Sequence, residues 1–473
     1  MYVGGNDGML HAFDDTASNG GKETWAYIPK ALFIAGDPND TAHAPASTFQ
    51  LGALTYRRGG IPLFSHKFYV NATPRVWDVD FANTNTSTPP TTGNDWRTIL
   101  VGGLGAGGRA VYALDVTNPV AVTDTEANVA SSGRVLWEFT DANLGYVYDA
   151  PTLVKTYRYG WVALIASGYS NPGGKGFLYV LNPKTGALLK KLTTGVGTDA
   201  VPSGLSAIRA FVGSRKNPYV LQAYGGDLLG NVWRFDLSSP DDTKWKVEVI
   251  AKLADPSGKP QAVTTGVRVE IDQNNNVDRY LFVATGKLLD QPDLSDTSVV
   301  NTMYVIRDGT RTTPEPAPVT PYSRANLNSV SGTSIAGFAA AATGRGWYQD
   351  ALNPNQKIIT DPYADVQIVV FAFSYPSADP CLGALSATLF ARDLTTGNSV
   401  LESAAGVVVA SADIGPGLAG VTLVQAQLTS TDLAPPVHIV ATTLRGQVYS
   451  FDVNLSTAAG TRHRVSWRLV NSN

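Results

Sequence analysis

The sequence predicts an all-β protein, a seven-bladed β-propeller with long inserted loops. Its composition favours short strands over helices, because 46 of the 473 residues are glycine and 9 Trp, 20 Tyr and 16 Phe supply large apolar side chains. The hydrophobic share of 44% excludes an intrinsically disordered chain, and the charged share of only 16% suits sheets that bury both faces. A pair of strands that recurs along the chain gives the number of blades.

The recurring unit begins with an apolar strand that ends in a small residue. Its second strand alternates aromatic and aliphatic residues and ends in Asp or Asn. Such recurrence is typical of propellers, in which each repeat forms one blade. The pairs occupy residues 2–5 with 9–14, 99–103 with 110–115, 163–168 with 177–182, 220–226 with 231–236, 281–286 with 303–308, 369–373 with 388–393, and 439–442 with 447–452.

Each pair is expected to gain a strand on either side, which gives the four strands of a propeller blade. Preceding strands are predicted at 75–81, 151–156, 205–212, 262–271 and 420–428, and following strands at 188–192 and 400–401. Three further following strands, at 24–27, 136–139 and 466–469, carry a tryptophan. We expect these tryptophans to pack between neighbouring sheets.

The whole chain, 1–473, is predicted to form one propeller domain. Its repeats are about 60 to 90 residues apart rather than the ~40–45 of a compact propeller, so insertions must decorate the blades. The clearest are at about 83–95 and 310–347, both rich in turn-forming residues. Because the first unit lacks its preceding strand, we expect the sequence to be the C-terminal part of a longer chain.

Charge and hydropathy narrow the class of partner. The formal net charge is −3, so no basic excess favours a nucleic acid. No run of residues is long and apolar enough for a membrane span. The single cysteine, Cys381, cannot form an internal disulfide, and we expect it to be a loop or buried thiol.

Two strings give the sequence a specific resemblance. They are YVGGNDGMLHAFD at 2–14, followed by AYIP at 26–29, and GDLLGNVWRFDL at 226–237, with further matches at 284–289, 345–348 and 379–381. On these strings the chain resembles the PilC/PilY family, the type IV pilus tip-associated adhesins with a C-terminal β-propeller. The resemblance covers essentially the whole chain.

The resemblance implies a non-enzymatic bacterial surface protein with a separate N-terminal region. Such a protein would assist pilus assembly, oppose retraction and mediate attachment. Its partners would be minor pilins at the pilus tip and a host or abiotic surface receptor. Its place would be extracellular, at the pilus tip or the outer-membrane surface.

One loop has the composition of a calcium site. Oxygen-bearing side chains occupy every second position at Glu270, Asp272, Asn274, Asn276 and Asp278. Calcium prefers several hard oxygen ligands from alternating loop positions and a backbone carbonyl. One Ca²⁺ ion is therefore predicted here, with the carbonyl of Asn276 as one of its ligands. A second frame starts at Asp272 and uses the carbonyl of Asp278. An Asn-rich hairpin that binds no ion is the alternative, since Asn and Asp also favour turns.

Related pilus proteins carry a calcium loop at a different place, just before the strand that leads to the GDLLGNVWRFDL string. Residues 213–219 hold that place here and contain no carboxylate. The calcium site has therefore either moved to residues 270–278 or been lost.

No catalytic set is found. The histidines, His11, His43, His66, His438 and His463, lie far apart without metal-binding spacing, and His11 is expected to be a packed strand residue. Two other functions fit the propeller prediction. A quinoprotein-like dehydrogenase would share tryptophan-marked blades and calcium, and a glycan-binding propeller would use exposed aromatic residues such as Trp347, Tyr348 and Tyr363.

Overall fold

The computed structural model describes residues 1–33, 57–58, 61–62, 68–84, 93–118, 133–214, 217–338, 344–377, 385–425, 437–443 and 446–454. The regular elements of these residues are β-strands and short 3-10 helices, which confirms the all-β prediction. None of the helices in this part of the chain has the length and apolar character needed to cross a membrane. Contacts divide the chain into two compact units, residues 1–228 with 233–248 and residues 229–232 with 249–473.

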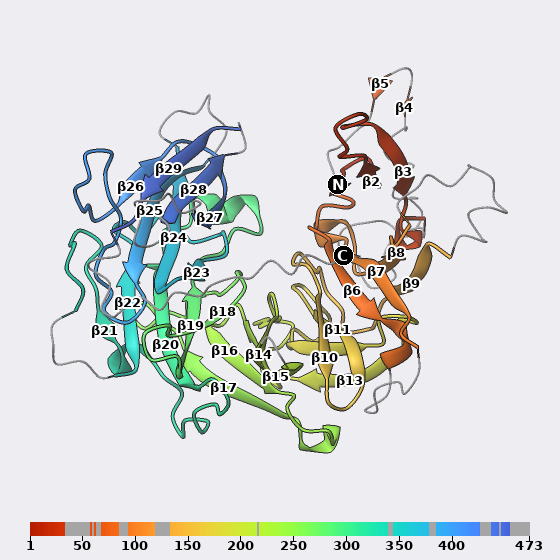
Figure 1. Ribbon diagram of the computed structural model, residues 1–473, viewed down its shortest axis with the longest axis horizontal. Helices are drawn as coiled ribbons and strands as arrows, with labels where there is room; N and C mark the ends of the chain where they lie inside the picture. Colours follow the sequence, from red (N-terminus) through yellow and green to blue (C-terminus); the bar gives the residue numbers. More distant parts are fainter. Residues whose placement is uncertain are drawn as a thin grey trace, which may run out of the picture. The chain divides into compact units, whose positions relative to one another are not determined.

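The first unit contains a series of sheets, drawn from red to green in Figure 1, whose strands are antiparallel except for one parallel pairing at Lys155 and Tyr219. Its strands are β1 (Tyr2–Gly4), β2 (Leu10–Phe13) and β3 (Glu23–Tyr27); β4 (Arg57–Arg58) and β5 (Ile61–Pro62); β6 (Arg75–Asp80), β7 (Trp96–Gly103), β8 (Val111–Asp115) and β9 (Val135–Phe139); β10 (Thr152–Thr156), β11 (Gly160–Ala166), β12 (Phe177–Leu181) and β13 (Leu188–Thr193); and β14 (Arg209–Ser214), β15 (Asn217–Gly226), β16 (Asn231–Asp236) and β17 (Lys246–Lys252). Its 3-10 helices are η1 (Lys30–Leu32), η3 (Phe81–Asn83), η4 (Gly105–Gly107) and η5 (Asp242–Lys244).

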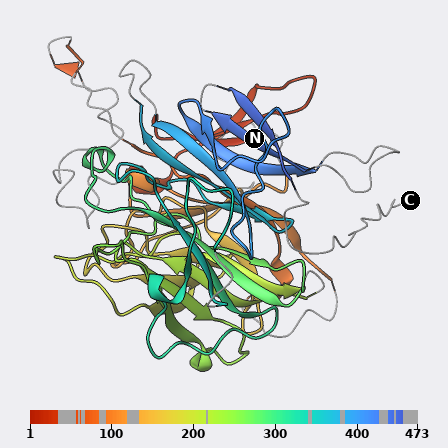
Figure 2. The ribbon, with the colours of Figure 1, turned by 90° about the vertical axis from the view of Figure 1, so that its left-hand side faces the viewer.

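The second unit continues the same pattern. Its strands are β18 (Arg268–Ile271), β19 (Asp278–Ala284), β20 (Thr302–Thr310), β21 (Asn328–Ser329) and β22 (Gly346–Asp350); β23 (Tyr363–Asp365), β24 (Ile368–Pro376), β25 (Leu385–Asp393) and β26 (Ala412–Ile414); and β27 (Leu418–Gln425), β28 (Val437–Thr443) and β29 (Val448–Asp452). Its 3-10 helices are η6 (Gln291–Leu294) and η7 (Arg324–Asn326). The long strands β24 and β25 run side by side in Figure 2.

Every predicted strand pair lies on neighbouring strands of one sheet: β1 with β2, β7 with β8, β11 with β12, β15 with β16, β19 with β20, β24 with β25, and β28 with β29. The preceding strands are also found, as β6, β10, β14, β18 and β27. Two of them are shorter than predicted. Residues before Arg209 and Arg268 make only single bridges, such as Leu205 with Gly168 and Val263 with Gly286.

The following strand predicted at 400–401 is wrong. Ser399 bridges Arg392 and Val400 donates to the carbonyl of Ala391, so the chain begins to pair with β25. It then leaves the sheet, and Leu401 bridges Val453 instead. The neighbour of β25 is β26, which pairs at the other end of that strand. The strand predicted at 466–469 lies outside the described residues.

Both faces of the sheet β23–β26 are buried, as the low charge content suggested. Alternate residues of a strand point to opposite faces. Val369, Phe371 and Phe373 of β24 pack in a cluster with residues of β19, β20 and β22, which belong to the preceding sheet. Their neighbours along the strand, including Ile368 and Val370, pack in a second cluster with β28 of the following sheet. Successive sheets of this unit therefore stack face to face.

The predicted insertion at 310–347 is not wholly a loop. It contains η7 and β21, and its last two residues begin β22. Strand β21 runs parallel to β22, with Asn328 paired to Trp347. The insertion predicted at 83–95 is described only at its ends. Whether residues 1–473 form one domain stays a prediction.

Candidate functional site

The predicted calcium loop connects β18 to β19 and closes as a tight turn. Strand pairing ends at Ile271 opposite Arg279. The Asp272 N–H then donates to the Asp278 carbonyl at 2.8 Å, and the Asn276 N–H donates to the Asp272 carbonyl at 2.7 Å. Asn276 adopts a left-handed conformation (φ 55°), which asparagine tolerates better than most residues. The carbonyl of Asp278, a ligand in the second calcium frame, is therefore used by the turn itself.

Arginines take up most of the predicted ligand oxygens. Glu270 accepts from Arg268 at 3.0 Å, and Asp278 accepts from Arg307 at 2.7 Å. The side-chain oxygen of Asn276 accepts from Arg311, which also approaches the Asn276 carbonyl at 3.4 Å. These contacts satisfy the negative charges at both ends of the loop.

Asp272 is the exception among the predicted carboxylates. It is only 4% exposed, and its Oδ1 accepts from the Asn274 N–H at 2.9 Å. Burial is the main reason that its pKa is raised above the usual value, and the charges of Asp278 and Asp393 raise it further. Glu270 and Asp278 thus face cations, whereas Asp272 faces the interior and other carboxylates.

The loop in this conformation does not fit one calcium ion held by all five predicted residues. The part of the chain that the structure describes contains no group of three or more His, Cys, Asp or Glu side chains that could hold a metal. Binding at Glu270 and Asp278 would require their arginines to move away. Alternating oxygen-bearing residues are compatible with both an ion site and a turn, so spacing alone did not separate the two.

The place of the family's calcium loop is a hairpin in this chain. Ser214 of β14 pairs with Asn217 of β15, so only Arg215 and Lys216 lie between the paired positions. This connection is too short for a calcium loop and has no carboxylate. The residues present do not fit the ion there.

Trp137, one of the three tryptophans predicted to pack between sheets, does so, and Trp347, which was not among them, makes the same kind of contact. Trp137 of β9 is 6% exposed, and its Nε1 donates to the Pro183 carbonyl in the turn after β12 at 2.9 Å. Trp347 of β22 is fully buried and donates to the Leu394 carbonyl, also at 2.9 Å, in the turn after β25. We call these two contacts the tryptophan junctions. Each junction also contains a left-handed glycine of the turn, Gly186 or Gly397, which packs against the indole.

The GDLLGNVWRFDL string has a structural explanation in its Asp227. This side chain is fully buried, and it accepts from Trp233 Nε1 at 2.8 Å and from the Ser203 hydroxyl at 2.9 Å. Arg234, which follows Trp233 in the string, is 2% exposed and pairs with Glu248 at 2.8 Å. Sequence analysis missed this network, because it used the string only as a sign of resemblance and assigned no contacts to its Asp, Trp and Arg residues.

His11 lies on a strand, β2, but its ring binds two carboxylates instead of packing in the core as predicted. Its Nδ1 lies 2.6 Å from a Glu23 carboxylate oxygen and its Nε2 lies 2.9 Å from a carboxylate oxygen of Asp7, with the imidazole 19% exposed. A ring that contacts carboxylates through both nitrogens favours the protonated form, which has two donors. The hydrogen bond to Glu23 is the main reason that the pKa of His11 is raised above its usual value.

We expect the free energy of unfolding to fall as pH rises above neutrality because of His11. A raised pKa means that the folded state binds the proton more tightly than the unfolded chain, whose histidine pKa is about 6.5. The stabilisation is complete below that value and is lost as pH rises through the folded pKa. Urea unfolding between pH 5.5 and 8.5 measures the loss, and His11→Gln should flatten this part of the profile. A His11 ring that titrates at or below 6.5 by NMR would contradict the expectation.

The aromatic platform required by the glycan-binding alternative is not formed. Trp347 is fully buried in its junction. The ring of Tyr348 lies beneath the Arg324 guanidinium at 4.3 Å, and that of Tyr363 lies 5.5 Å from Arg268. The prediction that Trp347 is an exposed ligand-binding residue is wrong, because its strand faces the next sheet. Cys381 lies outside the described residues.

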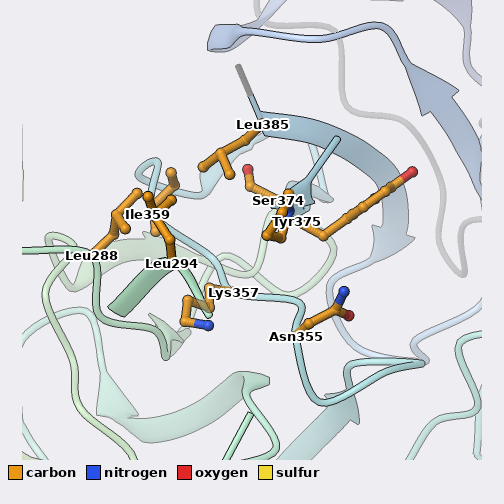
Figure 3. Close-up of a pocket in the computed structure, with 9 residues that line it drawn as sticks. Leu288, Leu294, Asn355, Lys357, Ile359, Ser374, Tyr375 and Leu385 are labelled. Atoms are coloured by element: carbon orange, nitrogen blue, oxygen red, sulfur yellow. The ribbon is translucent and has the colours of Figure 1, made fainter. Parts of the chain in front are cut away.

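A small, largely apolar hollow lies beside the end of β24. Figure 3 shows Leu288, Leu294 and Ile359 along one wall and Tyr375 opposite. Lys357 lies at its floor, and its Nζ donates to the Asp296 carbonyl at 2.7 Å. Burial lowers the pKa of Lys357. Nothing in the structure shows which molecule would cover this hollow.

Comparison with known proteins gives a consistent result. The family described as the PilY1 beta-propeller domain matches residues 1–330. A type IV pilus biogenesis factor PilY1 of Pseudomonas aeruginosa is 30% identical in an alignment that covers 84% of this chain and 34% of the relative. A PilY1 homolog of Xylella fastidiosa is also 30% identical, over 65% of this chain and 19% of the relative. The chain thus spans about a third or less of these relatives.

A solved structure shows the same fold. The crystal structure of the Pseudomonas aeruginosa PilY1 C-terminal domain aligns with a TM-score of 0.67 and 24% identity, covering 96% of this chain and 92% of that domain. The curated relatives are named as pilus biogenesis factors. On the matched family and the identity to its relatives, this chain belongs to the PilY1 beta-propeller family.

Proposed function

We propose that this chain is the propeller module of a type IV pilus biogenesis factor, and that it acts in pilus assembly and surface attachment. The observation that carries the proposal is the 30% identity to a pilus biogenesis factor over 84% of the chain. We also propose seven blades, on the grounds that all the predicted strand pairs occupy neighbouring strands.

The proposed location is the cell surface, at the pilus tip or the outer membrane. The proposed partners are minor pilins of the pilus and a host or abiotic surface receptor. A module with little net charge and both sheet faces buried would present its loops to such partners, because the strands themselves are occupied by packing.

We include calcium-dependent control of pilus extension and retraction in the proposal. Of the five residues predicted from the sequence, Asp272 is the one whose carboxylate faces the interior, while Glu270, Asn276 and Asp278 contact arginines. Calcium binding by the complete loop would need these contacts to break, so affinity should be weak unless the ion is held elsewhere.

Deletion of residues 1–473 from the full-length protein in its source bacterium tests the pilus role. We expect surface pilin and twitching motility to fall, and both to return when the intact protein is supplied from a second copy. The measurements are pilin sheared from cells and the diameter of twitching zones. Total pilin should stay constant, since assembly rather than synthesis is affected.

A matched control is the full-length protein with Trp77→Ala, which changes an indole that is 49% exposed. We expect this variant to restore pili as the wild type does. If the deleted protein accumulates to the normal level and surface pilin is unchanged, the assignment of a pilus role to this part of the protein is wrong.

A further inference from the structure

Asp272 shares its buried environment with a carboxylate from the next sheet. Asp272 directly follows β18, whereas Asp393 is the last residue of β25. The two side chains are 4% and 0% exposed. The charge of Asp393 acts on Asp272, and both charges act on Tyr280. Asp393 pairs with Ile368 at the start of β24, and the side chain of the neighbouring Gln367 bonds to Gln273, which follows Asp272. Both carboxylates therefore lie near Gln367 at a sheet junction.

Asp393 has one fully satisfied oxygen and one oxygen without a partner. Its Oδ1 accepts from the N–H groups and hydroxyls of Thr395 and Thr396 at 2.8 to 3.0 Å. Its Oδ2 is buried and has no hydrogen-bond partner among the described residues. A buried carboxylate oxygen is costly when unpaired, so native proteins satisfy it with a donor or a cation.

Gln367 bonds to the residues that directly follow the two aspartates. Its side-chain carbonyl accepts from the N–H of Gln273 at 3.0 Å, next to Asp272. Its backbone carbonyl accepts from the N–H of Leu394 at 2.9 Å, next to Asp393. Its side chain is 7% exposed, and its Nε2 has no hydrogen-bond partner among the described residues. These bonds fix the loop after β18 against the turn after β25.

The arginines beside the loop after β18 are engaged with other carboxylates, and Arg392, which precedes Asp393, donates to Gln349 and to backbone carbonyls. Arg268 pairs with Glu270, and Arg307 pairs with Asp278 and Glu315. The charged groups that act on Asp272 are themselves carboxylates, Asp278 and Asp393. Two like charges held together in a protein interior repel each other unless a positive charge lies between them.

We propose that Asp272 and Asp393 bind one divalent cation of the calcium class at the junction of β18–β22 with β23–β26. Calcium suits this place because carboxylates, amide and backbone carbonyls and water are its ligands. Two carboxylates neutralise one such ion, and water and carbonyl oxygens complete its coordination. This site deepens the proposed calcium dependence on which it rests, and it differs from the loop site predicted from the sequence, because Glu270 and Asp278 are not ligands.

Calcium-dependent thermal stability of the complete chain tests the site. We expect the midpoint of unfolding to rise when Ca²⁺ replaces EDTA, and to rise less with Mg²⁺. Asp393→Asn and Asp272→Asn should weaken Ca²⁺ binding, measured by calorimetry, at least tenfold. Each substitution keeps the shape of the side chain and most of its hydrogen bonds, so both variants are expected to fold.

Asp278→Asn is the matched control, since it removes a carboxylate of the loop and leaves the buried pair intact. It should retain Ca²⁺ binding within about threefold. The reverse pattern, in which Asp278→Asn loses binding and Asp393→Asn retains it, would overturn the buried pair in favour of the loop.

Terbium luminescence gives a readout that does not depend on stability. Tb³⁺ occupies oxygen sites suited to calcium, and excitation of the nearby Tyr280 should sensitise it. The signal should compete with Ca²⁺ and be lost in Asp393→Asn. If no form of the protein binds Ca²⁺, and Asp393→Asn instead removes a pH dependence of stability in EDTA, the two carboxyl groups share a proton and the cation site is wrong. The deletion experiment on pili would keep its meaning in that case.

Discussion

Replacing Trp347 by alanine should lower the free energy of unfolding of this chain by about 3 to 5 kcal/mol. Trp347 is the largest fully buried side chain among the described residues, and its loss removes apolar contacts with Val330 and the aromatic cluster of β19 and β24. The Leu394 carbonyl also loses the indole N–H as its donor. Chemical denaturation followed by circular dichroism measures the change.

Trp77→Ala serves as the matched control for Trp347→Ala. The Trp77 indole is 49% exposed, so its removal should change the free energy of unfolding by less than about 1 kcal/mol. Equal effects of the two substitutions would show that burial in the junction is not what makes Trp347 important. Trp347→Phe should give an intermediate loss, because it keeps part of the apolar volume and removes the hydrogen bond.

Gly186→Ala should destabilise the chain by about 2 to 5 kcal/mol, for two reasons that add. Gly186 has φ 71°, and a residue with a Cβ pays roughly 1 to 2 kcal/mol in that region. A Cβ at this position would also lie 2.7 Å from the Trp137 ring, which overpacks the junction by about 1 to 3 kcal/mol. Thermal or urea unfolding of the purified chain measures the sum.

Gly195→Ala separates the two reasons. Gly195 has φ 72°, nearly the same backbone conformation as Gly186, but nothing lies within 4 Å of a Cβ built on it. It should cost only the backbone part, about 1 to 2 kcal/mol. If Gly195→Ala is as harmful as Gly186→Ala, contact with Trp137 contributes nothing, and the tryptophan junction is not a source of stability.

Most of the fold could be predicted because the repeated features are local. A strand such as β11 shows its identity in a few consecutive apolar residues, and its partner β12 is the next strand along the chain, beginning at Phe177. The wrong strand at 400–401 shows the limit of that reasoning. Val400 and Leu401 have the apolar character of a strand and are buried, but the sheet position beside β25 is taken by residues further along the chain.

The candidate site was less predictable because its decisive contacts are distant in sequence. Arg307, which pairs with Asp278, comes from β20, and Asp393 comes from another sheet. No spacing rule relates these residues to Asp272. The same applies to His11, whose partner Glu23 is on the neighbouring strand, although Asp7 at four residues' distance was visible.

In both tryptophan junctions the indole comes from the earlier sheet and the turn that covers it comes from the later one, which bears on the order of folding. Trp137 of β9 contacts the turn at 183–186, and Trp347 of β22 contacts the turn at 394–397, so each indole is covered by residues that are synthesised later. A growing chain that has reached only β9 therefore still exposes Trp137. Each sheet is completed when the next one arrives, and folding can advance from the N-terminal end one sheet at a time. Until then the uncovered indole is a surface to which a chaperone could bind.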